Sequence, residues 1–249
     1  EFCADARLVG VGLLPIDDVE RSIKDLDYAV SVGLEAMWIP HRLANGHSPG
    51  HTGLDPLWAR FVENDVPFLL HVGGAALKVE PGWLENGRPI PNDWLGGGEN
   101  VRSKDMMGLH HLPEQFLSTM VLDGVLERFP ALRGGVIELG AGWVPSMLAR
   151  LALVAGIWSR SEPLLKDMQR TPSQQIIEQI RFTPFVFEDV GAIINASDPR
   201  LYMFSSDYPH PEGGRDPLGR FGRTLEGQNA ETLDRFYTQN FADLMETSV

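Results

Sequence analysis

Three side chains that could do chemistry stand where apolar runs of the sequence end. His71 closes "FLLH", Glu138 follows "GGVI", and Asp207 follows "LYMFSS". A neutral imidazole and a carboxylate are ligands for a divalent metal such as zinc. A carboxylate beside a metal can also take a proton from a bound water whose pKa the metal has lowered. The residue types and their positions therefore indicate metal-assisted acid–base chemistry at strand ends.

Each of these residues also has a purely structural explanation. His71 could be a satisfied core histidine, Asp207 could be a turn or N-cap aspartate, and Glu138 could pair with a buried arginine. Position favours chemistry for Asp207, because a carboxylate placed after an apolar strand is costly to bury without a cation or a hydrogen-bond donor.

The loop that contains Asp207 carries further reactive groups, in "DYPHPEGG" (207–214). We expect His210 to take part in catalysis, and Tyr208 and Glu212 to shape the rim around the substrate. For His210 and Glu212, solvated turn residues are an equal alternative.

His41 and Arg42 follow another apolar run, "GLEAMWIP" (33–40). We expect this pair to bind an anionic group of the substrate. Ordinary surface polarity after the run explains the pair equally well.

Apolar runs alternate with helical patterns along the whole chain. Each run is too continuous to have a solvent-facing side, which is typical of parallel strands covered on both faces. The six runs are 7–15, 33–40, 66–74, 132–140, 180–187 and 200–209. Apolar residues recur at helical spacing between and after them, beginning with a helix near 17–30 that a capping box of Asp17 and Glu20 would start.

This alternation predicts a parallel α/β sheet, either open and doubly wound or closed into a barrel. An open sheet normally carries a glycine-rich phosphate loop after a strand, and "HVGG" (71–74) and "ELGAGW" (138–143) do not match that pattern. Reactive residues at several strand ends mark the active site of a (β/α)8 TIM barrel. We predict a single barrel domain over residues 1–249, with the six runs as strands three to eight and the first two strands missing from this chain.

One long connection, from about residue 75 to 112, interrupts the alternation. It is rich in Gly, Pro, Asn and Trp, and it has no periodic apolar face. Loops of this length in compact domains are usually functional, so we predict a lid over the site, with a disordered insertion as the alternative.

Composition limits the partners and the compartment. The net charge of −13 and the absence of basic clusters argue against nucleic acid and anionic membranes. No apolar run approaches the roughly 20 residues of a membrane span. A single cysteine, Cys3, excludes an intrachain disulfide and fits a reducing compartment, so we predict a cytoplasmic protein.

Three motifs are specific enough to compare with known families: "HVGG" (71–74), "FPALRGGVIELGAGWVPSMLARL" (129–151) and "MFSSDYPHPEG" (203–213). Together they resemble the amidohydrolase-related family of metal-dependent (β/α)8 enzymes, which includes aminocarboxymuconate-semialdehyde decarboxylase and the γ-resorcylate-type decarboxylases. The resemblance implies one divalent metal, zinc first and manganese second, with His71 and Asp207 as two of its ligands. It also implies a homodimer that acts on a small-molecule substrate. The family's ligands from strand one have no counterpart in this sequence.

The resemblance implies a metal-dependent hydrolase that cleaves a C–N or C–O bond of a small carboxylated or cyclic compound with a metal-activated water. Asp207 would be the base and Glu138 a proton relay. The alternative is a non-oxidative metal-dependent decarboxylase of a similar substrate. Glu138 stands where the family's decarboxylases have a histidine, which favours the hydrolase in this comparison. A second alternative is a non-catalytic, truncated or degenerate barrel.

Overall fold

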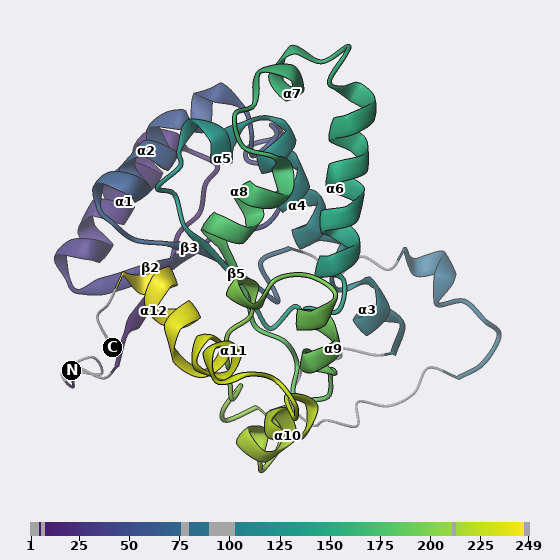
Figure 1. The fold of residues 1–249 in the computed structure, drawn as a ribbon. Coiled ribbons are helices and arrows are strands. Elements are labelled where there is room, and N and C mark those ends of the chain that lie inside the picture. The colour runs from purple at the N-terminus through teal and green to yellow at the C-terminus, as the bar shows by residue number, and fades with distance from the viewer. Residues whose placement is uncertain (1–4, 6–7, 76–79, 90–102, 211–212, 247–249) are drawn as a thin grey trace.

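The centre of the fold is a parallel sheet (Figure 1). The computed structural model describes residues 5, 8–75, 80–89, 103–210 and 213–246. Within these residues the sheet has five strands: β1 (Gly10–Leu13), β2 (Leu34–Trp38), β3 (Phe68–His71), β4 (Gly134–Ile137) and β5 (Ile180–Phe182). Every neighbouring pair is parallel, and the spatial order β1-β2-β3-β4-β5 is the order along the chain.

This strand order belongs to a barrel-type α/β fold. A doubly wound sheet reverses its order at a switch point, where its ligand binds. A sheet that adds each new strand on the same side is wound in one direction, as in (β/α) barrels. The predicted fold class is therefore confirmed as a parallel α/β fold of this type.

The sixth apolar run does not form a strand. A single parallel bridge joins Tyr202 to Phe182, and the amide of Met203 donates to the carbonyl of Phe182 at 3.0 Å. The next amide, of Phe204, donates to the carbonyl of Phe236 at 2.8 Å. Because Phe236 lies in the π-helix η6 (Arg235–Gln239), the backbone leaves the sheet after one bridge. The prediction of a full strand over 200–209 was wrong in extent, although the segment lies at the expected place in the order.

Helices follow the strands, as the sequence predicts. The α-helices are α1 (Val19–Ser31), α2 (Asp55–Glu63), α3 (Ser103–Gly108), α4 (His111–Leu122), α5 (Val125–Arg128), α6 (Val144–Trp158), α7 (Pro163–Asp167), α8 (Pro172–Gln179), α9 (Val190–Asn195), α10 (Pro217–Thr224), α11 (Ala230–Asp234) and α12 (Asn240–Met245). Short 3-10 helices are η2 (Thr52–Leu54), η3 (Pro81–Trp83) and η4 (Pro199–Leu201).

The start of α1 differs from the predicted capping box. Asp18, and not Asp17, caps the helix by accepting a hydrogen bond from the amide of Arg21 at 3.1 Å. Asp17 instead accepts two hydrogen bonds from Arg42, at 2.8 and 2.7 Å. The predicted capping box placed the capping carboxylate at Asp17, one position before the residue that caps the helix. Aspartate is a good cap at either position, so the sequence alone does not distinguish Asp17 from Asp18.

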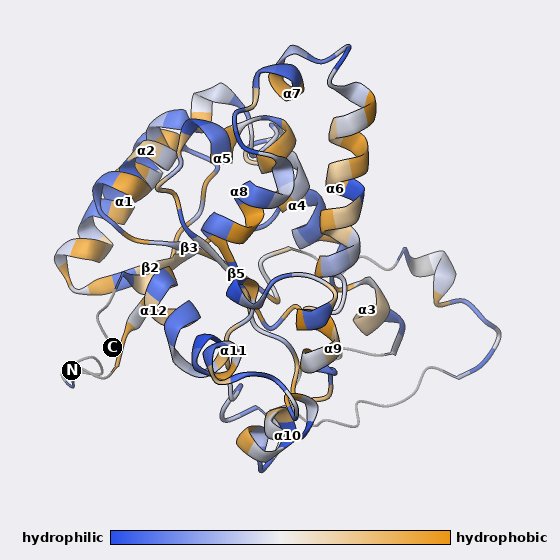
Figure 2. Ribbon diagram, viewed as in Figure 1, coloured by the Kyte–Doolittle hydropathy of each residue, from blue (hydrophilic) through white to orange (hydrophobic). Residues whose placement is uncertain are grey.

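The core lies between the sheet and the helices. Fully buried aromatic side chains include Trp58, Phe61, Phe68 and Phe182. Figure 2 shows apolar and polar residues alternating along α1, α2 and α8, as expected for helices with one buried face. A Cβ atom on Gly134 would lie 2.3 Å from the Phe68 ring, so glycine at this position lets the neighbouring strand carry a phenylalanine. This packing fixes β3 beside β4 and hence the relative positions of their carboxyl ends.

The predicted lid over 75–112 is described only in part. Residues 76–79 and 90–102 of it lie outside the described residues. The described part contains η3 and α3, and extends to the right of the sheet in Figure 1. The Lys104 ammonium group donates to the carbonyl of Trp83, and the Trp83 side chain is exposed. A lid function for this segment stays a prediction.

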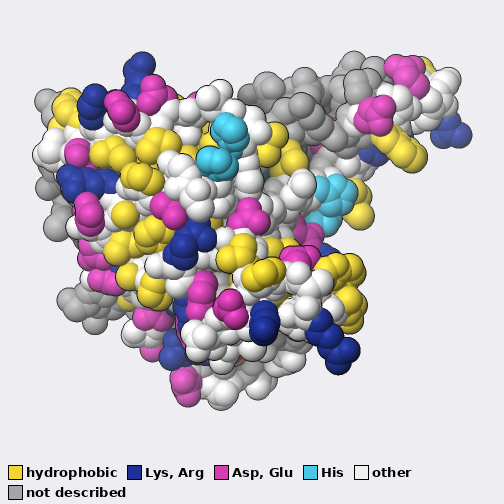
Figure 3. Space-filling model, turned by 90° about the horizontal axis from the view of Figure 1, so that it is seen from above, with side chains coloured by type: hydrophobic (Ala, Val, Ile, Leu, Met, Phe, Trp, Pro, Cys, Tyr) yellow, Lys and Arg dark blue, Asp and Glu magenta, His cyan; other side chains and the backbone are white. Residues whose placement is uncertain are grey.

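Two observations on the described residues bear on the predicted partners. No helix there combines the length and the apolar composition needed to cross a membrane. On the face shown in Figure 3, acidic and basic side chains are interspersed, and no basic patch stands out.

Candidate functional site

The site residues come from the carboxyl ends of neighbouring strands. His71 is the last residue of β3 and pairs in register with Ile137, the last residue of β4. Glu138 follows Ile137 directly, and Asp207 lies in the loop after the Tyr202 bridge. The structure therefore brings His71, Glu138 and Asp207 to one edge of the sheet, which is where the active sites of barrel enzymes lie.

Glu138 and His71 are in direct side-chain contact. The His71 Nε2 atom lies 2.9 Å from Glu138 Oε2, and the Glu138 side chain is only 10% exposed. His71 Nδ1 lies 2.8 Å from the carbonyl oxygen of Val72, an arrangement in which Nδ1 carries the proton and donates it. Burial alone lowers the pKa of His71, but the contacts with Glu138 and Val72 outweigh burial and raise that pKa above its usual value. The partner of Glu138 is thus a histidine and not the arginine that sequence reasoning allowed.

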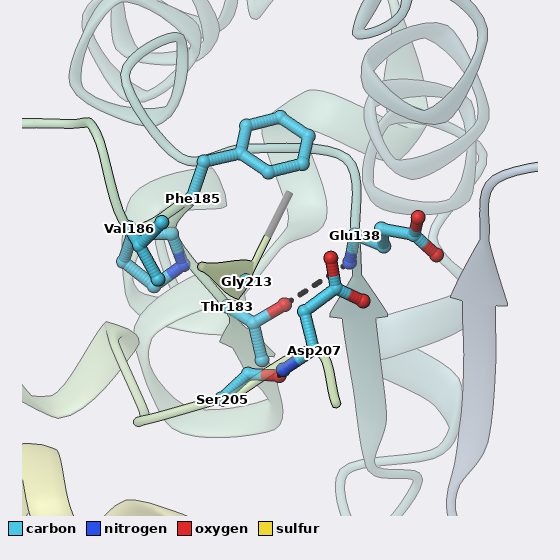
Figure 4. A pocket seen from close by; sticks show the side chains of 8 residues that line it. Glu138, Thr183, Phe185, Val186, Ser205, Asp207 and Gly213 are labelled. Atoms are coloured by element: carbon cyan, nitrogen blue, oxygen red, sulfur yellow. Dashed lines mark hydrogen bonds between the residues drawn. The ribbon is translucent and has the colours of Figure 1, made fainter. Parts of the chain in front are cut away.

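His210 joins the two carboxylates. Its Nδ1 atom lies 3.5 Å from Glu138 Oε1 and 3.7 Å from Asp207 Oδ1. One ligand atom from each of Glu138, Asp207 and His210 lies within 4.8 Å of the others. Glu138, at the end of β4, and Asp207, in the loop before Gly213, line the same small pocket (Figure 4). We call these three residues and His71 the carboxylate–histidine cluster.

Glu138 and Asp207 share an uncommon backbone conformation. Their φ angles are +56° and +54°, in the left-handed region that non-glycine residues seldom adopt. The amide of Glu138 donates to Thr183 Oγ1 at 3.1 Å, and the amide of Asp207 donates to Ser205 Oγ at 3.4 Å. Such conformations cost on the order of 1–3 kcal/mol each and are found at functional sites. The backbone is therefore held in a costly shape that directs both carboxylates into the cluster.

Glu188 holds together two loops that follow neighbouring strands. Its carboxylate accepts hydrogen bonds from the amides of Gly142 and Phe185, each at 2.7 Å, and from Ala141 at 3.0 Å. These amides belong to the loop after β4 and the turn after β5. Glu188 follows an apolar run as Glu138 does, yet its contacts indicate a structural role.

His41 lies beside the cluster, and Arg42 points elsewhere. The His41 side chain is buried, and its Nδ1 atom has no hydrogen-bond partner among the described residues. Burial, reinforced by the positive charge of His71, lowers the pKa of His41 to about 4. The Arg42 guanidinium binds Asp17, which raises the pKa of Arg42. Substrate binding by these two residues stays a prediction. The charge of Arg42 already has a partner in the Asp17 carboxylate.

The remaining rim residues are placed only in part. Tyr208 is 88% exposed beside the cluster, so its predicted role in substrate binding stays a prediction. Glu212 lies outside the described residues.

The donor set of the cluster fits a divalent metal. Carboxylate oxygens and imidazole nitrogens are common ligands for zinc and manganese. A histidine that donates from one ring nitrogen to a backbone carbonyl, as His71 does to Val72, is oriented as metal-binding histidines usually are. When Nδ1 carries the only ring proton, the Nε2 lone pair faces the Glu138 carboxylate, and the two electron-rich groups repel each other. A proton or a metal cation between Nε2 and the carboxylate removes this repulsion.

The fold is of the barrel type and the cluster has a donor set that suits a divalent metal, and the comparisons agree with this class. A family model described as "Amidohydrolase" matches residues 3–244, so the chain belongs to the amidohydrolase family. Decarboxylase orsB of Emericella nidulans is 26% identical over 243 residues, which cover 96% of this chain and 70% of that protein.

Solved structures show the same fold. An amidohydrolase from Mycobacterium avium subsp. paratuberculosis K-10 aligns with a TM-score of 0.76 and 22% identity, over 94% of this chain and 57% of that one. A manganese-bound 5-carboxyvanillate decarboxylase from Novosphingobium aromaticivorans aligns with a TM-score of 0.69 and 17% identity, over 96% of this chain and 64% of that one. A 2,6-dihydroxybenzoate decarboxylase in complex with 2,6-dihydroxybenzoate aligns with a TM-score of 0.65 and 18% identity, over 96% and 71%.

These comparisons bear on the two predicted reactions. Three of these similar proteins are named as decarboxylases. The chain spans just over half the length of the first structural relative. The activity of the whole protein is therefore stated below only as a proposal.

Proposed function

We propose that this protein is a metal-dependent, non-oxidative decarboxylase of a small hydroxy-aromatic carboxylate. The observation that carries the proposal is the convergence of Glu138, Asp207 and His210 with His71 at the carboxyl edge of a barrel-type sheet. The names of the similar proteins supply the reaction and the substrate class.

His71, Glu138 and Asp207 would hold the metal, zinc first and manganese second. Bound there, the cation would supply positive charge that attracts the anionic substrate. The two carboxylates would offset the charge of the cation, and the neutral imidazole would add a nitrogen ligand. The buried position of Glu138 strengthens its attraction to a cation, because little water screens it.

His210 would move the proton that the reaction needs. Decarboxylation breaks the bond between the ring carbon and the carboxylate, releases carbon dioxide, and forms a C–H bond with one proton. His210 Nδ1 lies within 3.7 Å of both Asp207 Oδ1 and Glu138 Oε1, which can hold a proton at that nitrogen. Its side chain is 42% exposed, so it can exchange protons with water between turnovers.

The proposal includes a homodimer that takes a small-molecule substrate. The dimer rests on the family resemblance described above, and light scattering on the purified protein measures it directly.

The test is product analysis on purified protein loaded with Mn²⁺ or Zn²⁺. A panel of hydroxybenzoates carrying ¹³C in the carboxyl group is incubated with the protein, and labelled carbon dioxide is measured by mass spectrometry. We expect release of labelled carbon dioxide that the Asp207→Asn variant lacks and the exposed-site variant Asp234→Asn retains. Hydrolysis of amide or lactone analogues without carbon dioxide release would overturn the proposal in favour of the hydrolase.

A further inference from the structure

Thr183 continues the pairing of β4 with β5 beyond the end of β5. It follows Phe182, the last residue of that strand, and its amide donates to the carbonyl oxygen of Val136 at 2.9 Å. Parallel pairing therefore brings Thr183 to the carboxyl edge of the sheet, beside the residues that follow Val136. The Thr183 side chain is only 4% exposed, so its hydroxyl group finds its partners within the protein.

The Thr183 hydroxyl group joins two backbone groups of the neighbouring strand end. It accepts a hydrogen bond from the amide of Glu138 at 3.1 Å, drawn as a dashed line in Figure 4, and donates to the carbonyl oxygen of Val136 at a longer 3.4 Å. A hydroxyl group can do both at once, because it has one proton and two lone pairs. The proton lies toward Val136, and a lone pair faces the Glu138 amide.

This hydrogen bond acts on a strained part of the backbone. The φ angle of Glu138 is +56°, which costs free energy in a residue other than glycine. The Glu138 amide is partly buried, so losing its acceptor would add the cost of an unsatisfied donor. The bond to Thr183 therefore favours the backbone conformation in which the Glu138 carboxylate contacts His71.

A rotation of the backbone at Glu138 would move both of its carboxylate oxygens. Oε2 lies 2.9 Å from His71 Nε2, and Oε1 lies 3.5 Å from His210 Nδ1. Thr183 lines the same small pocket as Glu138 and Asp207. The hydroxyl group of Thr183 thus sets the position of a carboxylate in the cluster through the backbone that carries it.

We propose that Thr183 is a positioning residue of the metal site, whose hydroxyl group holds the Glu138 backbone so that the carboxylate can bind the cation. The inference rests on the proposed function for the metal site alone. It requires neither a substrate nor a reaction, so metal binding tests it separately.

The test measures the affinity for Zn²⁺ by competition with a chelator. Thr183→Val keeps the shape of the side chain and loses the hydroxyl group, whereas Thr183→Ser keeps the hydroxyl group and loses the methyl group. Thr183→Ala is a second variant without the hydroxyl group, in case valine prevents folding. Each variant is made in the wild type and again in Glu138→Gln, and urea midpoints of the metal-free proteins are recorded.

The matched control is Thr232→Val. Thr232 lies on α11 and is 6% exposed, so this change also removes the hydroxyl group of a buried threonine. A general loss of stability would lower the urea midpoint in both valine variants, whereas the proposed role predicts a loss of Zn²⁺ affinity in Thr183→Val alone.

We expect Thr183→Val and Thr183→Ala to bind Zn²⁺ about tenfold or more weakly than the wild type, a loss typical of removing a group that orients a metal ligand. Thr183→Ser should stay close to the wild-type affinity. In Glu138→Gln, the change to valine should have no further effect, because the hydroxyl group acts through the carboxylate that is already gone.

Unchanged Zn²⁺ affinity in Thr183→Val would overturn the proposal. An equal loss with and without the Glu138 carboxylate would do the same, as would a loss in Thr183→Ser as large as in Thr183→Val. If the metal results hold but labelled hydroxybenzoates release no carbon dioxide, the positioning role of Thr183 stands and the proposed decarboxylase fails.

Discussion

His71 Nε2 and Glu138 Oε2 lie 2.9 Å apart and join the carboxyl ends of two neighbouring strands. Sequence reasoning placed both residues at strand ends but left Glu138 to pair with an arginine. Through this contact, Glu138 links His71 to the rest of the carboxylate–histidine cluster. The first prediction follows from this role.

Replacing Glu138 by glutamine should weaken metal binding by at least about tenfold, because the amide keeps the shape of the side chain and loses its charge. Metal per chain after gel filtration is measured by elemental analysis, and the affinity by competition with a chelator. Glu231→Gln is the control, since Glu231 is 81% exposed and lies on α11. Unchanged metal affinity in Glu138→Gln would remove Glu138 from the metal site.

Asp207→Asn should lower turnover by about 100-fold or more while leaving the fold intact, a loss typical of removing a group that acts in proton transfer or charge stabilisation. The Asp207 side chain is 21% exposed, so the change leaves the buried core untouched. The rate of carbon dioxide release and the circular dichroism spectrum are compared in the wild type, Asp207→Asn and the exposed-site control Asp234→Asn. Near-normal turnover in Asp207→Asn would show that Asp207 is a turn residue.

Glu188→Gln should destabilise the metal-free protein by about 1–3 kcal/mol. The carboxylate accepts from the amides of Ala141, Gly142 and Phe185, and the NH2 group of glutamine cannot accept from them. Urea unfolding of the wild type, Glu188→Gln and the exposed-site variant Glu226→Gln measures the effect. Equal unfolding midpoints for all three would mean that the two loops are held by other contacts.

The sequence predicted the sheet and the strand-end residues because their signals are local. An apolar run ending at His71 or before Glu138 marks a strand end, and parallel strands place such ends together. The early exit at Phe204 could not be predicted, because it depends on a hydrogen bond to Phe236, which lies 32 positions later in the chain.

The geometry of the site was harder to predict than its composition. The left-handed backbone at Glu138 and Asp207 has no local signal, since neither residue is glycine. Hydroxyl groups of Thr183 and Ser205 support that conformation, and the first comes from a different strand end. His210 was left balanced between a catalytic and a turn residue because its approach to Glu138, 72 positions earlier in the chain, has no local signal.

The stability contributed by Asp198 should depend on pH. Asp198 caps η4 and accepts from the backbone and the guanidinium of Arg200, which holds the pKa of Asp198 below its usual value of 3.8. A lowered pKa in the folded state means that the contribution is fully present above about pH 4 and is lost as the pH falls through the folded-state pKa. Asn can still cap η4 but carries no charge to pair with Arg200, so Asp198→Asn should cost up to about 1 kcal/mol at pH 7 and less at pH 3. Urea unfolding at both pH values, with Asp234→Asn as control, measures the difference; a cost that is the same at both would contradict the assignment.

Gly213 should be intolerant of alanine because it packs against the loop that carries Asp207. A Cβ atom on Gly213 would lie 2.0 Å from the carbonyl oxygen of Ser206 and 3.1 Å from Asp207 Cβ, and the first distance forces backbone to move. The movement would draw the Asp207 carboxylate away from Glu138 and His210. We expect Gly213→Ala to lose bound metal and carbon dioxide release together.

The matched control for this change is Gly222→Ala. Gly222 lies within α10, and nothing stands within 4 Å of the position that its Cβ would take. Alanine there should be neutral or should stabilise the helix by up to about 1 kcal/mol, because glycine is the weaker helix former. Metal content, carbon dioxide release and the urea midpoint of the metal-free protein are measured for both variants. If Gly213→Ala keeps one metal ion per chain and normal turnover, the loop can shift without moving Asp207, and the close packing at Gly213 is not what positions the carboxylate.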